Sequence, residues 1–159
     1  MSVETERKFL LSNDSWKDGS TGKLYKQGYI STNPDSTVRI RIIDDVGFLT
    51  IKGLTTGISR PEFEYEIPLD DATVMLQTMC RHSIIEKIRY RIYYQDFLWE
   101  IDEFKGDNQG LILAEIELQS EDQVFPKPEW LGNEVSDDNR YYNSQLSINP
   151  YKNWGQQSS

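Results

Sequence analysis

The chain has 159 residues, of which 37% are hydrophobic and 27% charged, and this composition excludes a protein that is disordered over most of its length. Its net charge is −9, which argues against non-specific nucleic-acid binding, and no apolar run approaches the ~20 residues of a membrane-spanning helix. A polar start without a signal-peptide pattern and a single cysteine, Cys80, predict a cytoplasmic protein.

Strand patterns dominate the chain, because short runs of alternating apolar and polar residues recur from the N-terminus onward. Residues 44–47 and 93–96 have the composition of hairpin turns between neighbouring antiparallel strands. A closed barrel leaves no open sheet edge, so we predict a mainly β (α+β) fold, an eight-stranded antiparallel β-barrel tunnel with a few helices packed outside. The expected strands lie near residues 3–10, 24–31, 37–43, 48–53, 62–67, 84–92, 97–104 and 111–119.

Helical signals are few. Residues 70–82 begin with acidic residues, place Val74, Met75 and Met79 at helical spacing and end at His82, so they predict a helix. A short helix is expected to open within residues 11–16, and a third helix within 136–146, with Ser136 as its N-cap. Residues 1–154 are predicted to form one domain and residues 155–159 a disordered tail.

Apolar and charged residues alternate in most of these strands, so each strand has one apolar face and one charged face. The charges are also segregated by sign, because some strands carry only cations on that face and others only carboxylates. The cationic faces hold Arg39, Arg41, Lys52, Lys87, Arg89 and Arg91, and the acidic faces hold Glu62, Glu64, Glu66, Glu100, Asp102, Glu115 and Glu117. At the N-terminus, Glu4 and Glu6 share a face with Lys8.

The simplest interpretation of any single strand is a sheet with a buried face and a solvated face. Like charges at positions i and i+2 lie ~7 Å apart, however, and repel by about 2 kcal/mol at an effective dielectric constant of about 20. Arg and Lys bind phosphate oxygens, whereas clustered carboxylates bind Mg²⁺ or Mn²⁺. We therefore predict that the charged faces line a shared cavity for a polyanion and divalent cations, and that the apolar faces point outward.

The motif Glu4-x-Glu6-x-Lys8 reads ExExK, and it is followed in order by "VRIRI", "LTIKG", "SRPEFEYEIP", "IEKIRYRI", "WEIDEFKG" and "GLILAEIEL". Together these blocks resemble the CYTH domain family, also called triphosphate tunnel metalloenzymes, over nearly the whole chain. The chain is most similar to the short, single-domain bacterial members. The resemblance implies a β-barrel tunnel that hydrolyses or transfers a triphosphate with Mg²⁺ or Mn²⁺. Members include inorganic triphosphatases, thiamine triphosphatases and class IV adenylate cyclases.

The same resemblance implies roles for the charged residues. The metal ligands would be Glu4, Glu6, Glu115 and Glu117, with Glu62 and Asp102 either binding a second metal or bracing the arginines. The triphosphate would be gripped by Lys8, Arg39, Arg41, Lys52, Lys87, Arg89 and Arg91, the last near the tunnel mouth. Tyr29 resembles a tyrosine that pairs with the ExExK lysine. The predicted catalytic residues are Lys8, Tyr29 and Glu64, and Glu64, like Glu62 and Asp102, would bind a second metal or brace the arginines.

We therefore predict a metal-dependent triphosphatase that converts inorganic tripolyphosphate to pyrophosphate and phosphate. A class IV adenylate cyclase or a thiamine or nucleoside triphosphatase of the same fold stays open, as do a non-catalytic polyphosphate-binding module and an ordinary barrel interaction module. With one histidine and one cysteine, a zinc site of the His/Cys type is excluded. We expect a small-molecule triphosphate as partner, neither nucleic acid nor membrane, and a monomer or homodimer.

Overall fold

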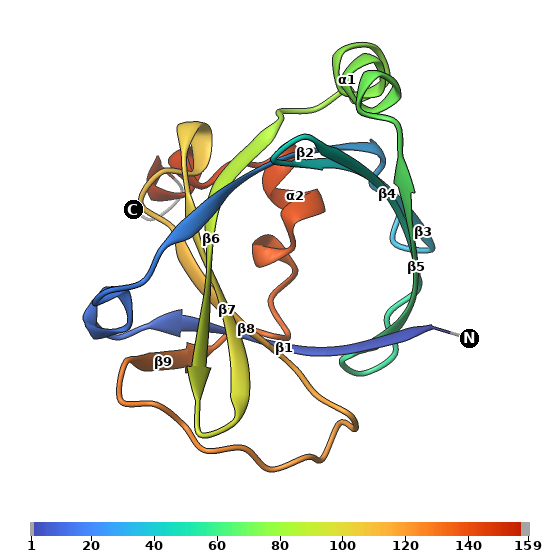
Figure 1. Cartoon of the computed structure of the whole chain (residues 1–159). Coiled ribbons are helices and arrows are strands. Elements are labelled where there is room, and N and C mark those ends of the chain that lie inside the picture. The colour runs from blue at the N-terminus through green and yellow to red at the C-terminus, as the bar shows by residue number, and fades with distance from the viewer. Residues whose placement is uncertain (1, 157–159) are drawn as a thin grey trace.

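The computed structural model describes residues 2–156, and its body is a closed antiparallel barrel (Figure 1). Hydrogen-bonded neighbours follow the order β5-β4-β3-β2-β6-β7-β8-β1, and β1 pairs with β5 to close the ring, which confirms the predicted eight-stranded barrel. The barrel strands are β1 (Val3–Leu11), β2 (Gly22–Ser31), β3 (Ser36–Ile43), β4 (Val46–Gly53), β5 (Ser59–Ile67), β6 (Ile85–Tyr94), β7 (Phe97–Phe104) and β8 (Ile112–Glu117).

A ninth strand, β9 (Leu131–Glu134), was not predicted from the sequence and pairs with the second half of β1. The Glu6 amide donates to Ile58 in front of β5, and the Lys8 carbonyl accepts from Val135 after β9. Backbone groups two residues apart on a strand point to the same edge, so β5 and β9 occupy successive halves of one edge of β1. The strand that carries Glu4, Glu6 and Lys8 is therefore held along its length on that side.

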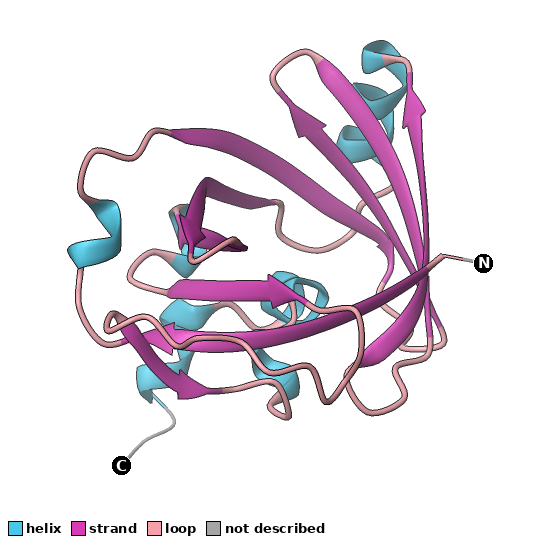
Figure 2. Ribbon diagram, turned by 60° about the horizontal axis from the view of Figure 1, so that its bottom comes forward, coloured by secondary structure: helices cyan, strands magenta, loops and turns pink. Residues whose placement is uncertain are grey.

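Helix contributes little to the structure, and twisted strands make up its body (Figure 2). The helices are α1 (Leu69–Thr78) and α2 (Asn143–Ile148), with 3-10 turns at η1 (Ser15–Lys17), η2 (Gly106–Asn108), η3 (Asn139–Tyr141) and η4 (Tyr151–Gln156). None of these helices is long and apolar enough to cross a membrane, as far as residues 2–156 are concerned. Of the predicted disordered tail, residues 155–156 lie in η4 and residues 157–159 lie outside the described part.

The apolar faces of the strands point outward, as the alternation predicted. Helix α1 packs Ala72 and Leu76 against Ile40 on the outside of the sheet. A second cluster covers the outer faces of β1, β7 and β8, where Phe9, Trp99 and Ile101 meet residues from the loops. The hairpin turns at Asp44–Asp45 and Gln95–Asp96 have positive φ angles at Asp44, Gln95 and Asp96, as two-residue hairpins require.

The C-terminal segment differs from the expected helix over residues 136–146. The Ser136 hydroxyl accepts the Lys8 amide at 2.9 Å and donates to Glu134 at 2.7 Å, so it binds the neighbouring strands and caps no helix. Helix α2 begins only at Asn143, and it lies across the opening of the ring in Figure 1, while α1 lies outside it. The Asn143 side chain bonds Lys87 and Gln27 on the barrel wall, so this helix contributes to the interior.

Leu146 anchors this segment, because it is fully buried in a cluster with Tyr29, Ile85 and Phe104. We expect Leu146→Ala to lower the free energy of unfolding by about 2–5 kcal/mol through the cavity that it leaves. Ile148→Ala in the same helix is the matched control, since Ile148 is 46% exposed and its loss should cost no more than about 0.5 kcal/mol. Urea unfolding of both variants measures this, and equal losses would show that α2 is not docked through Leu146.

Candidate active site

The barrel encloses a cavity of about 330 Å³ that all eight barrel strands line together with residues of the C-terminal segment. Its charged lining residues are balanced, seven acidic against seven basic, although the whole chain has a net charge of −9. The acidic ones are Glu4, Glu6, Glu62, Glu64, Glu100, Glu115 and Glu117, and the basic ones are Lys8, Arg39, Arg41, Lys52, Arg60, Lys87 and Arg89. Tyr29 also lines the cavity, so thirteen of the fifteen predicted site residues meet there.

Arg91 and Asp102 are the two that do not line it. Arg91 is exposed, because β6 runs on past the cavity into the hairpin turn at Gln95–Asp96. Asp102 lies behind the wall and is fully buried. Its Oδ1 accepts from Arg89 at 2.7 Å, and its Oδ2 accepts from Lys87 at 2.7 Å and from Arg89 at 2.8 Å. Both oxygens thus accept hydrogen bonds from cations. This favours the prediction that Asp102 braces Arg89 over the prediction that it binds a metal.

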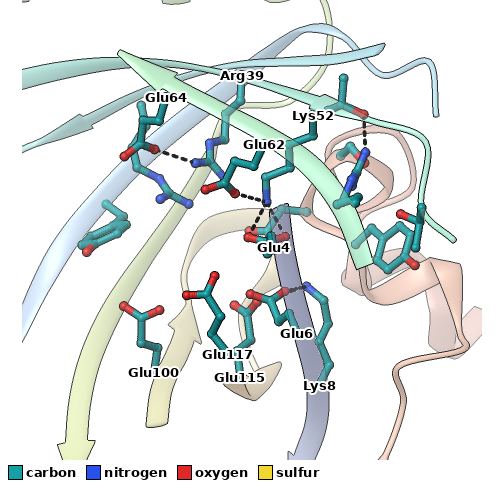
Figure 3. A pocket seen from close by; sticks show the side chains of 18 of the residues that line it. Glu4, Glu6, Lys8, Arg39, Lys52, Glu62, Glu64, Glu100, Glu115 and Glu117 are labelled. Carbon is teal, nitrogen blue, oxygen red and sulfur yellow. Dashed lines mark hydrogen bonds and ion pairs between the residues drawn. The ribbon is translucent and has the colours of Figure 1, made fainter. Parts of the chain in front are cut away.

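Carboxylates from neighbouring strands stand close together on one side of the cavity. Figure 3 shows Glu6, Glu115, Glu117 and Glu100 along this side, with Arg39 and Lys52 across from them. The Lys8 ammonium lies 3.3 Å from Glu115 and 3.6 Å from Glu6. Burial and the charges of Glu115 and Glu4 raise the pKa of Glu6 well above its usual value, while Lys8, Glu6 and Arg89 hold the pKa of Glu115 far below it despite burial. These carboxyls therefore compete for a positive charge.

A second acidic pair joins β1 to β5. The Lys52 ammonium lies 3.1 Å from both carboxylate oxygens of Glu4 and 3.2 Å from Glu62. Although burial opposes it, Lys52 holds the pKa of Glu4 at about 2, whereas burial and Glu4 raise the pKa of Glu62 to about 7. Glu117 has a raised pKa as well, because of burial and the charges of Glu4 and Glu100.

Several arginines of the cavity are incompletely neutralised. Burial and the charges of Arg39 and Arg89 lower the pKa of Arg41 to about 9, and its Nε donates only to the neutral amide of Gln27, at 2.8 Å. Arg60 donates to the Gly53 carbonyl and to the Thr37 hydroxyl. The buried Nε of Arg39 has no hydrogen-bond partner among the described residues. Unpaired guanidinium donors around a cavity form a binding site for anions.

The Lys87 ammonium is held in the same positively charged region. It is buried, and burial together with Arg89 and Arg41 lowers its pKa to about 7 even though Asp102 opposes the shift. It also donates to the Asn143 Oδ1 at 2.9 Å. A bound polyanion would favour the protonated form of this lysine, so its charge and anion binding are coupled.

Known proteins are similar to this chain in sequence and in fold. The sequence profile of the CYTH domain matches residues 2–147. The chain belongs to the CYTH domain family. The inorganic triphosphatase of Acetivibrio thermocellus is 51% identical to it over 154 residues, which span 97% of this chain and 99% of the relative. The inorganic triphosphatase of Nitrosomonas europaea is 37% identical over 151 residues, or 92% of this chain and 97% of the relative.

Solved structures show the same barrel fold. The crystal structure of an inorganic triphosphatase has a TM-score of 0.65 and 32% identity to this chain, covering 90% of it and 96% of that protein. A protein of Pyrococcus horikoshii has a TM-score of 0.54 at 16% identity, covering 74% and 80%, and this likeness extends to the fold alone. Because the CYTH family consists of metal-dependent enzymes, membership implies a divalent cation in the reaction.

Uncharged residues also form the wall of this cavity or lie directly behind it, and Tyr25, Gln27 and Asn143 were not predicted from the sequence as site residues. The ring of Tyr25 lies under two guanidinium groups, 4.9 Å from Arg41 and 5.0 Å from Arg89. Gln27 lies between Tyr25 and Tyr29 on the same face of β2, so the strand alternation could have grouped them. Between Tyr25 and Tyr29, however, this face carries no charged residue, so the search for charged strand faces did not find it. Asn143 comes from α2, and no periodic signal in the sequence marks it.

Proposed function

We propose that this chain hydrolyses inorganic tripolyphosphate to pyrophosphate and phosphate with Mg²⁺ or Mn²⁺. The observation that carries the proposal is the cavity itself, where under-neutralised arginines face carboxylates that compete for positive charge. A linear polyanion and a hard divalent cation are together the ligands that such a lining balances. The similarity to inorganic triphosphatases over more than nine-tenths of the chain supports the same substrate.

In this proposal the cationic side chains bind the phosphates and stabilise the charge that builds up during phosphoryl transfer. Arginine forks suit non-bridging phosphate oxygens, and Arg39, Arg41 and Arg60 line the cavity. Although burial opposes it, Glu115 and Glu6 hold the pKa of Lys8 above its usual value. Lys8 therefore stays protonated and acts as a fixed positive charge beside the reacting phosphate rather than as a base.

The carboxylates fit a divalent cation in their chemistry. Glu6 stands opposite Glu117 in the β1–β8 pairing and Lys8 opposite Glu115, which brings the ExExK carboxylates beside those of β8. Within residues 2–156, no three acidic, histidine or cysteine side chains converge on one point as they stand, so binding would draw the carboxylates together. We assign Glu4, Glu6, Glu115 and Glu117 as the holders, with Glu62 beside Glu4. A bound cation would neutralise phosphate oxygens and lower the pKa of a bound water.

A second candidate function rests on a neighbouring cavity of about 320 Å³. It adjoins the first one at Arg60, Thr37 and Tyr142 and contains Asp137 as its only acidic lining residue within the described part of the chain. Its polar, mostly uncharged lining suits an organic group, so ATP or thiamine triphosphate is the alternative substrate. A cytoplasmic location, a single domain and a monomeric or homodimeric state stay predictions of the sequence.

The test is phosphate and pyrophosphate release from tripolyphosphate, ATP and thiamine triphosphate in parallel, each with Mg²⁺, Mn²⁺ or EDTA. We expect metal-dependent cleavage of tripolyphosphate, a KM raised ~10-fold or more in Arg41→Ala, and kinetics within about twofold of wild type in Arg91→Ala, which lies outside the cavity. Faster cleavage of an organic triphosphate would favour the alternative. Tripolyphosphate binding without turnover of any substrate would indicate a non-catalytic module.

A further inference from the structure

A buried amide links two residues of the cavity wall. Gln27 lies on β2 and is 0% exposed. Its Oε1 accepts from the Arg41 Nε at 2.8 Å, and its Nε2 donates to the Tyr29 hydroxyl at 3.1 Å and to the Asn143 Oδ1 at 3.3 Å. One side chain thus contacts a proposed phosphate ligand, the proposed catalytic tyrosine and the C-terminal segment.

The chemistry of these partners fixes which way the amide points. A guanidinium nitrogen only donates, so the oxygen of Gln27 must face Arg41 and its nitrogen must face Tyr29. The Asn143 oxygen, which accepts from Lys87 on its other side, receives the second hydrogen of the same nitrogen. The reverse orientation would place two donors against each other at Arg41.

The direction of the Tyr29 hydroxyl follows from that of the amide. Its oxygen accepts from Gln27, so its own hydrogen must be directed elsewhere. Tyr29 lines the cavity, and within residues 2–156 its hydroxyl has no hydrogen bond besides the one from Gln27. We infer that Gln27 is a positioning residue, which presents the Tyr29 hydroxyl as a hydrogen-bond donor to a substrate phosphate oxygen and holds Arg41 beside it. This inference rests on the proposed function.

The same amide keeps Arg41 available to an anion. Gln27 is a neutral partner and occupies only the Nε, so it does not cancel the positive charge. Among the described residues, the two terminal nitrogens have no hydrogen-bond partner and are available to phosphate. The ring of Tyr25 supports the guanidinium from another side, at 4.9 Å. A carboxylate in place of this amide would instead pair with Arg41 and accept the Tyr29 hydrogen.

Gln27→Glu tests this directly, because glutamate has the same shape as glutamine. Its carboxylate would neutralise Arg41 and would accept the Tyr29 hydrogen, which then could not be donated to the substrate. We expect kcat for tripolyphosphate to fall ~10-fold, the usual worth of a hydrogen bond to a charged group, and KM to rise severalfold as Arg41 is neutralised. Tyr29→Phe should lower kcat by a similar factor. Adding Gln27→Glu to Tyr29→Phe should then lower kcat by less than about twofold, because both changes remove the same donor.

The matched control is Asn108→Asp, another amide-to-acid change at a buried position, 2% exposed and outside the cavity. It should leave kcat and KM unchanged. Thermal unfolding checks that each variant is folded. If Gln27→Glu fails to fold, Gln27→Met replaces it in the test, because methionine removes the amide without adding a charge. Wild-type kinetics in a folded Gln27→Glu, or losses in kcat that multiply in the double variant, would overturn the inference.

The experiment also separates this inference from the proposed function. If the wild type binds tripolyphosphate without cleaving it, the proposed function fails, and isothermal titration with tripolyphosphate then decides the inference. Weaker binding in Gln27→Glu and Tyr29→Phe, with no further weakening in the double variant, would uphold the positioning role. Equal binding by all variants would overturn it.

Discussion

Glu117→Gln is expected to lower tripolyphosphate turnover about 100-fold while leaving the metal-free protein as stable as the wild type or more so. Glu117 is one of the four carboxylates proposed to hold the cation, and burial together with Glu4 and Glu100 raises its pKa. Its charge is therefore unfavourable in the absence of metal. Glutamine keeps the shape of the side chain and removes the repulsion, but it is a much weaker ligand for a hard cation.

Two measurements test this expectation together. Steady-state turnover of Glu117→Gln over a wide range of Mg²⁺ concentration should be lower than that of the wild type and should partly recover at high Mg²⁺, because the loss of one ligand weakens Mg²⁺ binding. Urea unfolding in EDTA should give an unchanged or higher free energy. Glu86→Gln is the matched control, because Glu86 is an exposed glutamate on β6 that does not line the cavity. Full activity of Glu117→Gln at every Mg²⁺ concentration would exclude Glu117 as a metal ligand.

The fold could be predicted from the sequence because a closed barrel accommodates both the alternation of charged and apolar residues and the segregation of charges by sign. Strands such as those carrying Arg39 and Arg41, or Glu115 and Glu117, repel themselves unless charges of opposite sign face them across an enclosed space. Closure of the sheet supplies that space. The short strand β9 was missed because residues 131–134, with Gly132 and Asn133, have a low strand propensity and are ordered by pairing with β1.

The limits of the site prediction have a different physical origin. Alternation places Glu100 and Asp102 on one face, but it does not give the pairing between strands. That pairing sets Asp102 directly opposite Arg89, which turns a candidate metal ligand into a buried counter-ion. Arg91 shares a face with Arg89, yet it lies beyond the end of the cavity, and the sequence does not tell where the cavity ends. Asn143 reaches the wall only because Leu146 docks the segment that carries it.

Asp102→Asn is expected to have the largest effect on stability, a loss of about 3–5 kcal/mol in the free energy of unfolding, together with loss of activity. The carboxylate is fully buried and accepts three hydrogen bonds from Lys87 and Arg89. Among residues 2–156, asparagine would leave Arg89 paired with Glu115 and Glu100, and Lys87 without a carboxylate partner. The matched control is Glu103→Gln on the same strand, whose ion pair with Lys17 lies at the protein surface and contributes little to stability.

The loss in Asp102→Asn should also grow as the pH falls from about 8 to about 5.5. In the wild type the pKa of Lys87 is lowered to about 7, so below that pH the folded protein takes up the proton and pairs it with Asp102. Without Asp102 the pKa of Lys87 falls further, and the folded variant binds fewer protons than the folded wild type in this window. The unfolded chains keep Lys87 protonated in both, so stability is lost as the pH is lowered. Urea unfolding at both pH values measures this difference, and a loss independent of pH would show that Lys87 does not depend on Asp102 for its charge.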